Sequence, residues 1–192
     1  MPSHATIDEQ GWLGIARRVV SPNCDPRPQG IAIDLVVVHN ISLPPGRFGG
    51  HAVEQLFTNR LDAGEHPYYA TIAELRVSCH FFLRRSGALV QFVPCSMRAW
   101  HAGVSRWKGR ERCNDFSIGI ELEGTDTRPF TTRQYARLAR LIELLRERYP
   151  ITDVAGHSDI APGRKTDPGP AFDWTRLRSI LDGGPRIAFP NP

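Results

Sequence analysis

The sequence has few cysteines, few lysines and no long hydrophobic run. Its four cysteines form no CxxC pair, which excludes the usual zinc-finger and dithiol redox patterns and favours free thiols in a reducing compartment. The longest aliphatic run spans only residues 35–38, and the N-terminal residues lack the basic and apolar segments of an export signal. We therefore expect a cytoplasmic protein with no membrane partner.

The charge pattern argues against a nucleic-acid partner. The 24 basic and 20 acidic residues leave a formal net charge of +4, and the arginines are scattered along the chain. No stretch combines a basic run with interleaved aromatic residues, as a nucleic-acid-binding face requires. Only two basic residues are lysines, Lys108 and Lys165. Each lysine is therefore informative, because lysine can exchange a proton near neutral pH and arginine cannot.

The hydrophobic pattern predicts a single α/β domain over residues 1–182, with a central mixed β-sheet flanked by helices on both faces. Four segments have the residue pattern of strands: 31–38, 77–84, 88–93 and 117–123. Four segments have helical periodicity or capping residues: 8–19, 53–61, 131–149 and 173–181. Residues 183–192 are expected to form a loose C-terminal tail.

Residues suited to metal chemistry gather at the end of the first strand and in the loop 156–170. His39 follows the strand, and the loop contains His157 and Asp167 among three prolines and three glycines. Two imidazoles and one carboxylate are a ligand set that leaves one position open on tetrahedral zinc, as catalytic sites do. On spacing alone two other readings stay open: His39 bonded only to backbone groups, and a loop shaped by its prolines and glycines.

Four segments resemble the zinc-dependent N-acetylmuramoyl-L-alanine amidases. They are VVVHNISLPPG at 36–46, RAWHAGVS at 98–105, ERCNDFSIGIELEGTD at 111–126 and GHSDIAPGRKTDPGP at 156–170. The resemblance extends from about Gly11 to Arg178 and implies the amidase/peptidoglycan-recognition-protein-like α/β fold. Within the family, the chain is most similar to the branch that cleaves 1,6-anhydro-N-acetylmuramyl peptides in cytoplasmic peptidoglycan recycling.

The resemblance also implies a set of site residues. The family's zinc ligands correspond to His39, His157 and Asp167, for one zinc ion per chain. One branch has cysteine as the third ligand. The catalytic pair corresponds to Glu121, which would move the proton of water, and Lys165, which would stabilise the oxyanion. Glu123 is a rival to Glu121, because residues two apart in a strand point to one face.

Substrate contacts follow from the same resemblance. Asn40 and Trp100 correspond to positions that meet the anhydro-sugar. Arg76 and Arg112 correspond to positions that meet peptide carboxylates, which the planar guanidinium fork binds through both oxygens. His101 is expected to support the metal ligands rather than to be one.

The function expected is hydrolysis of the amide bond between (1,6-anhydro-)N-acetylmuramic acid and L-alanine. The expected partner is a small muropeptide, and the expected state is a monomer. Two alternatives stay open: a phage-type lytic amidase that acts on intact peptidoglycan, and a recognition module that binds peptidoglycan without cutting it.

Overall fold

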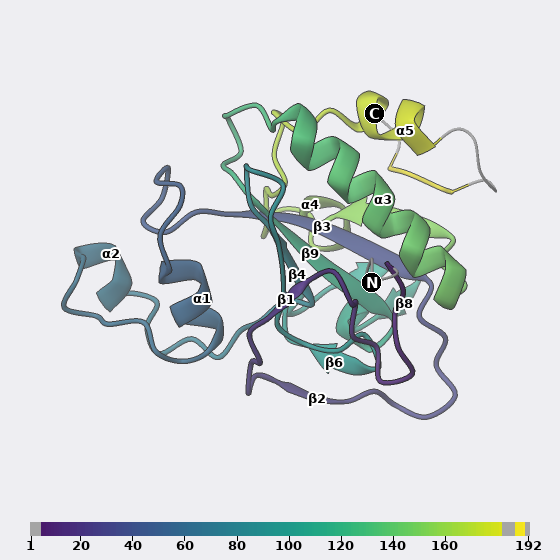
Figure 1. Cartoon of the computed structure of the whole chain (residues 1–192), viewed down its shortest axis with the longest axis horizontal. Coiled ribbons are helices and arrows are strands. Elements are labelled where there is room, and N and C mark those ends of the chain that lie inside the picture. The colour runs from purple at the N-terminus through teal and green to yellow at the C-terminus, as the bar shows by residue number, and fades with distance from the viewer. Residues whose placement is uncertain (1–4, 182–186, 191–192) are drawn as a thin grey trace.

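A six-stranded mixed sheet forms the centre of the computed structural model, which describes residues 5–181 and 187–190 (Figure 1). In spatial order its strands are β1 (Arg17–Arg18), β5 (Leu89–Gln91), β4 (Phe81–Leu83), β9 (Ser117–Glu123), β3 (Leu35–Ile41) and β10 (Asp153–Gly156). β4 and β5 pair antiparallel, and the other neighbours pair parallel. The predicted mixed sheet in a single α/β domain is confirmed.

The middle strands are buried on both faces. Residues 35–38 of β3 are fully buried because their aliphatic side chains contact two separate cores, one on each face of the sheet. β3 pairs with β9 over its whole length, with His39 opposite Glu121, and with β10, where Val38 lies opposite Gly156. The carboxyl ends of three adjacent parallel strands therefore meet at one edge.

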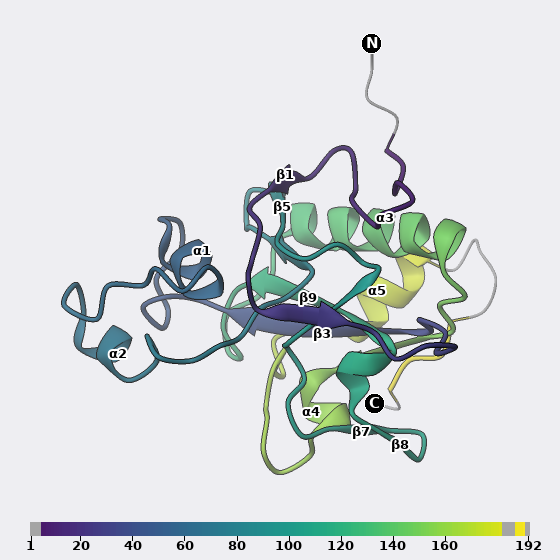
Figure 2. The same ribbon diagram turned by 90° about the horizontal axis from the view of Figure 1, so that it is seen from below.

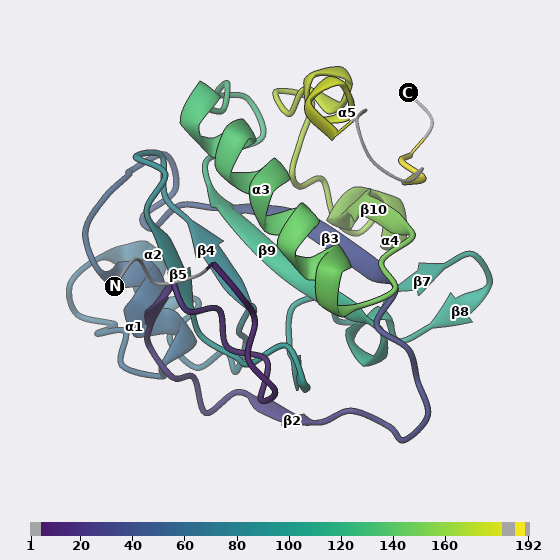
Figure 3. The same cartoon turned by 45° about the vertical axis from the view of Figure 1, so that its right-hand side comes forward.

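Helices cover both faces, as the sequence predicts. The helix α3 (Thr132–Arg148) lies across β9 and β3, and α5 (Trp174–Leu181) packs beside it (Figure 3). α3 begins with the predicted capping box between Thr131 and Gln134. On the opposite side lie the short helix α4 (His157–Ile160) and the hairpin of β7 (Arg106–Trp107) and β8 (Arg110–Glu111) (Figure 2).

Smaller elements complete the sheet's surroundings. α1 (Ala52–Phe57) packs against the side chains of β4 and β5 that face away from α3. The remaining elements are α2 (Pro67–Ala70), the 3₁₀ turn Cys113–Asp115, and the antiparallel pair β2 (Cys24–Pro26) and β6 (Met97–Ala99). No helix among residues 5–181 and 187–190 is both long and apolar enough to cross a membrane.

The helix predicted over residues 8–19 is wrong. The segment forms turns and the short strand β1 instead. Gly11 has a φ of +93°, and a Cβ there would lie 2.6 Å from the backbone nitrogen of Cys95. The carbonyl of Gly11 accepts a hydrogen bond from that nitrogen at 2.9 Å. This close backbone approach overrides the helical spacing of the apolar side chains.

The described part of the predicted loose tail is held by the sheet. Ala188 forms a parallel bridge with Asp153, and its backbone exchanges hydrogen bonds of 2.9 Å with Val154 and Thr152. Phe189 packs against Trp174 of α5. Residues 187–190 therefore extend the edge of β10 and are not loose, whereas 183–186 and 191–192 lie outside the described residues.

Candidate active site

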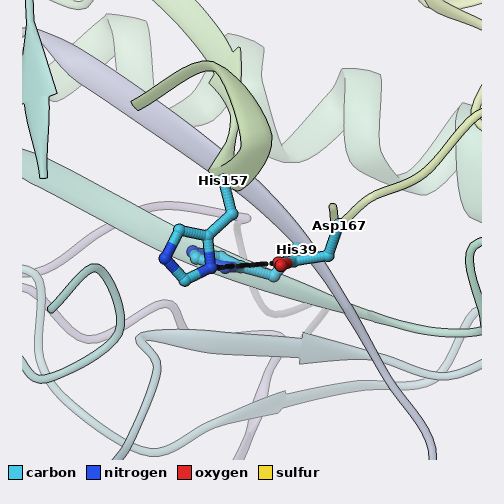
Figure 4. A group of neighbouring side chains, drawn as sticks. All are labelled: His39, His157 and Asp167. Atoms are coloured by element: carbon cyan, nitrogen blue, oxygen red, sulfur yellow. Dashed lines mark hydrogen bonds and ion pairs between the residues drawn. The ribbon is translucent and has the colours of Figure 1, made fainter. Parts of the chain in front are cut away.

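The end of the parallel sheet brings two histidines together. His39 lies on the face of β3 that turns away from α3, and His157 is the residue directly after β10. Because β3 and β10 are neighbours in register, the two side chains project into the same space. Asp167 reaches them from the loop that follows α4, as Figure 4 shows.

Three atoms of these side chains converge. His39 Nδ1 lies 3.0 Å from His157 Nδ1 and 3.0 Å from Asp167 Oδ2, and His157 Nδ1 lies 3.1 Å from the same oxygen. Both imidazoles are buried, with 1% and 4% of their surface exposed. Burial lowers the pKa of His39 to about 4, so the ring is neutral at physiological pH.

The donor set fits a metal ion. His157 Nε2 lies 3.1 Å from the carbonyl of Ala102, which only accepts, so Nε2 carries the proton and Nδ1 offers a lone pair. Two imidazole nitrogens and one carboxylate oxygen are zinc's usual ligands. Ligands about 2.0–2.1 Å from tetrahedral zinc are roughly 3.3 Å apart, close to the separations found here. The three predicted ligands are therefore placed to hold a metal.

The predicted catalytic pair lines the same cavity. The cavity measures about 540 Å³, and its walls include the three metal-site residues, Glu121 and Lys165. Glu121 Oε2 is buried and has no hydrogen-bond partner among the described residues. Burial raises the pKa of Glu121 well above its ordinary range; Asp167 raises it further, and Lys165 opposes the increase. A carboxylate in this environment is disposed to take up a proton.

The rival Glu123 has a different position. Its carboxylate accepts hydrogen bonds from the backbone nitrogens of Gly49, at 2.6 Å, and Arg85, at 3.0 Å, and pairs with Arg84 at 3.5 Å. It is buried and does not line the cavity. Glu123 therefore anchors the loop around Gly49, whereas Glu121 faces the space where a substrate would lie.

Two of the four predicted substrate residues line the cavity. The Asn40 side-chain nitrogen donates to Asp126 Oδ1 at 2.7 Å and to the Pro168 carbonyl at 3.0 Å, which leaves the amide oxygen as the available group. The Trp100 indole N–H donates to Asp25 Oδ1 at 3.1 Å. Both side chains are thus fixed by the protein before any substrate arrives.

The two predicted arginines lie outside this cavity. Arg76 is exposed and lies near Glu74, at 3.7 Å. Arg112 is also exposed, pairs with Asp115 at 3.3 Å, and borders a second cavity of about 520 Å³ with Arg106. The structure brings seven of the nine predicted site residues together and leaves these two apart.

Two residues of the cavity wall have roles that the sequence did not predict in detail. Asp126, which fixes the Asn40 amide, lies in the quoted segment 111–126, and only its place after β9 pointed to the site. His101 contacts His39 from behind, with Nδ1 3.0 Å from His39 Nε2. It is thus next to one of the predicted ligands and is not one of the three converging groups.

Comparisons of the sequence and of the structure with known proteins give matches to N-acetylmuramoyl-L-alanine amidases. Residues 29–170 match the model of N-acetylmuramoyl-L-alanine amidase. The chain is 59% identical over 175 residues to "1,6-anhydro-N-acetylmuramyl-L-alanine amidase AmpD" of Escherichia coli (strain K12), covering 90% of this chain and 96% of the relative. A crystal structure of a selenomethionine derivative of AmpD, 58% identical, matches with a TM-score of 0.88 and covers 90% of this chain and 98% of that one.

A third relative is a complex with a ligand. It is the N-acetylmuramyl-L-alanine amidase AmiD from E. coli with the substrate anhydro-N-acetylmuramic acid-L-Ala-D-γ-Glu-L-Lys. It is 29% identical, has a TM-score of 0.59, and covers 97% of this chain and 68% of that one. The resemblance inferred from the four sequence segments is confirmed.

Proposed function

This chain belongs to the N-acetylmuramoyl-L-alanine amidase family, and from that premise we propose that it hydrolyses the amide bond between 1,6-anhydro-N-acetylmuramic acid and L-alanine of the stem peptide. The observation that carries the proposal is the convergence of His39, His157 and Asp167 in one cavity with Glu121, whose Oε2 has no hydrogen-bond partner in the part of the chain that the structure describes. The relatives named for the anhydro-muramyl substrate support that choice of substrate.

The three ligand atoms would hold one zinc ion per chain. Bound there, zinc would polarise the scissile carbonyl and lower the pKa of water to about 7. Glu121 takes the proton of the attacking water through its free Oε2 and later delivers it to the leaving amine of L-alanine. Its raised pKa makes the carboxylate a stronger base than an exposed glutamate.

Lys165 acts on the other charge that develops. Its ammonium lines the cavity with Glu121 and stabilises the negative oxygen that forms on the attacked carbonyl, a contribution of about 3 kcal/mol in comparable sites. A compact ammonium suits this task because it is a point charge.

The remaining residues position the substrate. Asn40 offers its amide oxygen to an N–H of the anhydro-sugar's acetamido group, and Trp100 offers the flat face of its indole to the sugar ring. Arg76 and Arg112, outside the cavity, remain our candidates for the carboxylates at the far end of the stem peptide. The substrate is then a small muropeptide bound by a monomer, consistent with a role in cytoplasmic peptidoglycan recycling.

Product analysis tests this function. The protein is incubated with anhydro-muropeptide and, separately, with intact peptidoglycan, and the products are identified by mass spectrometry. We expect free stem peptide and anhydro-N-acetylmuramic acid from the small substrate, and much slower release from the polymer. Equal release from both would support a lytic amidase, and binding without cleavage would support a recognition module.

A further inference from the structure

The hydrogen-bond partner behind His39 is a second histidine. His39 Nε2 lies 3.0 Å from His101 Nδ1, and His101 Nε2 lies 3.2 Å from Ser117 Oγ. His39 and Ser117 are completely or almost completely buried, and His101 is 9% exposed. The outer N–H of a metal-binding histidine usually meets a carboxylate, a carbonyl or water, as His157 meets the Ala102 carbonyl here. His39 instead meets a neutral-ring acceptor.

Only one order of protons in this row leaves His39 Nδ1 free for a ligand bond. A neutral His39 that offers Nδ1 carries its proton on Nε2 and donates it to His101 Nδ1. His101 then carries its own proton on Nε2 and donates to the Ser117 hydroxyl oxygen. The reverse order would place a proton on His39 Nδ1, between the three converging atoms, and block the site.

The strand β9 has a glycine, and so no side chain, where the His101 ring packs against it. Gly119 lies against the ring, and a Cβ at this position would be 2.4 Å from His101 Cγ. His80 closes the other side, with ring centroids 5.8 Å apart, and its Nδ1 accepts a hydrogen bond from the Gly119 nitrogen at 3.0 Å. Residues 117, 119 and 121 of β9 all point to the same face of the sheet. The strand thus provides a partner for His101, space for its ring, and the carboxylate of the cavity.

We propose that His101 is a positioning residue that fixes the ring orientation and the proton position of His39, with Ser117 and Gly119 forming its seat. The inference rests on the metal site of the proposed function. Its chemical consequence is that the His39 ring is held without a negative charge behind it, because the acceptor is an imidazole and not a carboxylate.

Zinc affinity tests the proposal without reference to turnover. Zinc binding is measured by competition with a chromophoric chelator for the wild type, His101→Phe, His101→Gln and Gly119→Ala. Phenylalanine keeps a flat ring but accepts no hydrogen bond, so we expect zinc binding weakened 10- to 100-fold. The Gln oxygen can accept from His39 Nε2, so His101→Gln should recover most of this loss. Gly119→Ala should weaken binding because it displaces the ring.

A matched control is Gln91→Leu, which removes a fully buried, hydrogen-bonded polar side chain whose partners, Gly11, Leu13 and Val93, lie outside the His101 seat and the cavity. Thermal unfolding in chelator shows whether each variant folds without metal. Nitrogen-15 NMR of the zinc-loaded protein should find the His39 Nε2 proton hydrogen-bonded to His101 Nδ1 in the wild type, and the resonance of His39 Nε2 should shift in His101→Phe, where this acceptor is absent. Wild-type affinity and an unchanged His39 Nε2 resonance in His101→Phe, or an equal loss of affinity in Gln91→Leu, would overturn the proposal. Absence of zinc binding in the wild type would overturn the proposed metal site itself.

Discussion

Glu121 and Glu123 project from the same face of β9, yet both carboxylate oxygens of Glu123 accept hydrogen bonds from the protein while Glu121 Oε2 accepts none from the described residues. Glu123 accepts hydrogen bonds from the backbone nitrogens of Gly49 and Arg85 and forms an ion pair with Arg84. Glu121 Oε2 has no hydrogen-bond partner among the described residues. Identical side chains two residues apart therefore have different tasks: one stabilises a loop, and the other is available to a substrate.

Substitution of the two glutamates separates these tasks. We expect Glu121→Gln to retain zinc but lose about 100-fold or more in kcat, because glutamine cannot accept the proton of water. Glu123→Gln should lower the melting temperature and leave kcat within a few-fold. Both are measured with anhydro-muropeptide after zinc content has been verified. If instead Glu123→Gln loses most of its kcat and Glu121→Gln keeps a nearly normal kcat, Glu123 is the catalytic glutamate and Glu121 is not.

The raised pKa of Glu121 predicts a pH-dependent cost in stability. A carboxyl whose folded pKa exceeds its unfolded value favours the folded state only at low pH, and this stability is lost as the pH rises through the folded pKa. In chelator, Glu121→Gln should therefore melt above the wild type at about pH 8, and the difference should shrink toward about pH 5. Equal differences at both pH values, from thermal unfolding, would contradict the prediction.

Removal of the metal should abolish turnover reversibly. Chelation is expected to stop cleavage, and added zinc to restore it, because two histidine nitrogens and one carboxylate oxygen together form the site. Asp167→Ala should lower zinc content as well as rate, unlike Glu121→Gln. Elemental analysis and activity are measured on the same samples. Full turnover by verified metal-free protein would remove zinc from the mechanism.

The two lysines of the chain provide a test with an internal control. Lys165→Ala should lower kcat about 100-fold and retain zinc, because the ammonium opposite the developing oxyanion is lost. Lys108, in the turn between β7 and β8, forms an ion pair with Asp153 of β10 and does not line the cavity. Lys108→Ala should therefore leave kcat unchanged. Similar losses in both variants, in steady-state kinetics, would argue for a general effect of charge.

Arg112 tests the recognition of the peptide end. If it binds a stem-peptide carboxylate, Arg112→Ala should lower kcat/KM for anhydro-muropeptide by roughly 1.5–3 kcal/mol, as for a hydrogen bond to a charged group. The loss should shrink when the peptide is shortened to L-alanine. Arg106→Ala, on the border of the same second cavity, is the control. An unchanged kcat/KM in Arg112→Ala would remove this arginine from the substrate site.

Local sequence signals predicted two of the regular elements, β9 and α3, well. The bounds of β9 are those expected from its alternating residues, and α3 follows its capping box. The strand predicted over 31–38 lies at 35–41 instead. Hydrophobicity ends at Val38, but the hydrogen-bond pairing with β9 continues through the polar residues that face the site. The strand was predicted too short at this end because its last residues include polar side chains of the site, which lack the hydrophobic pattern of a strand.

The assembly of the site depends on contacts between distant segments, which local patterns only suggested. His39 and His157 meet only because β10 pairs with β3, a contact between segments more than a hundred residues apart in the sequence. Spacing alone left the metal open, and the prediction of the three ligands came from the family resemblance. The Glu121 and Glu123 alternatives also required tertiary contacts, since Gly49 and Arg85 approach β9 from other parts of the chain.

The parallel ladder divides the active centre into a constant part and an exchangeable part. Backbone pairing places His39 and Glu121 on adjacent strands, one strand spacing of about 4.8 Å apart. His157 directly follows Gly156, which pairs with Val38, so the same ladder also positions His157. Asp167 and Lys165 belong to one loop after α4. Substitutions in this short loop can therefore change the proposed third ligand, Asp167, or the cation, Lys165, without changing the residues that the strands position. A cysteine as third ligand, which the family resemblance gives for another branch, is the kind of variant that this division permits.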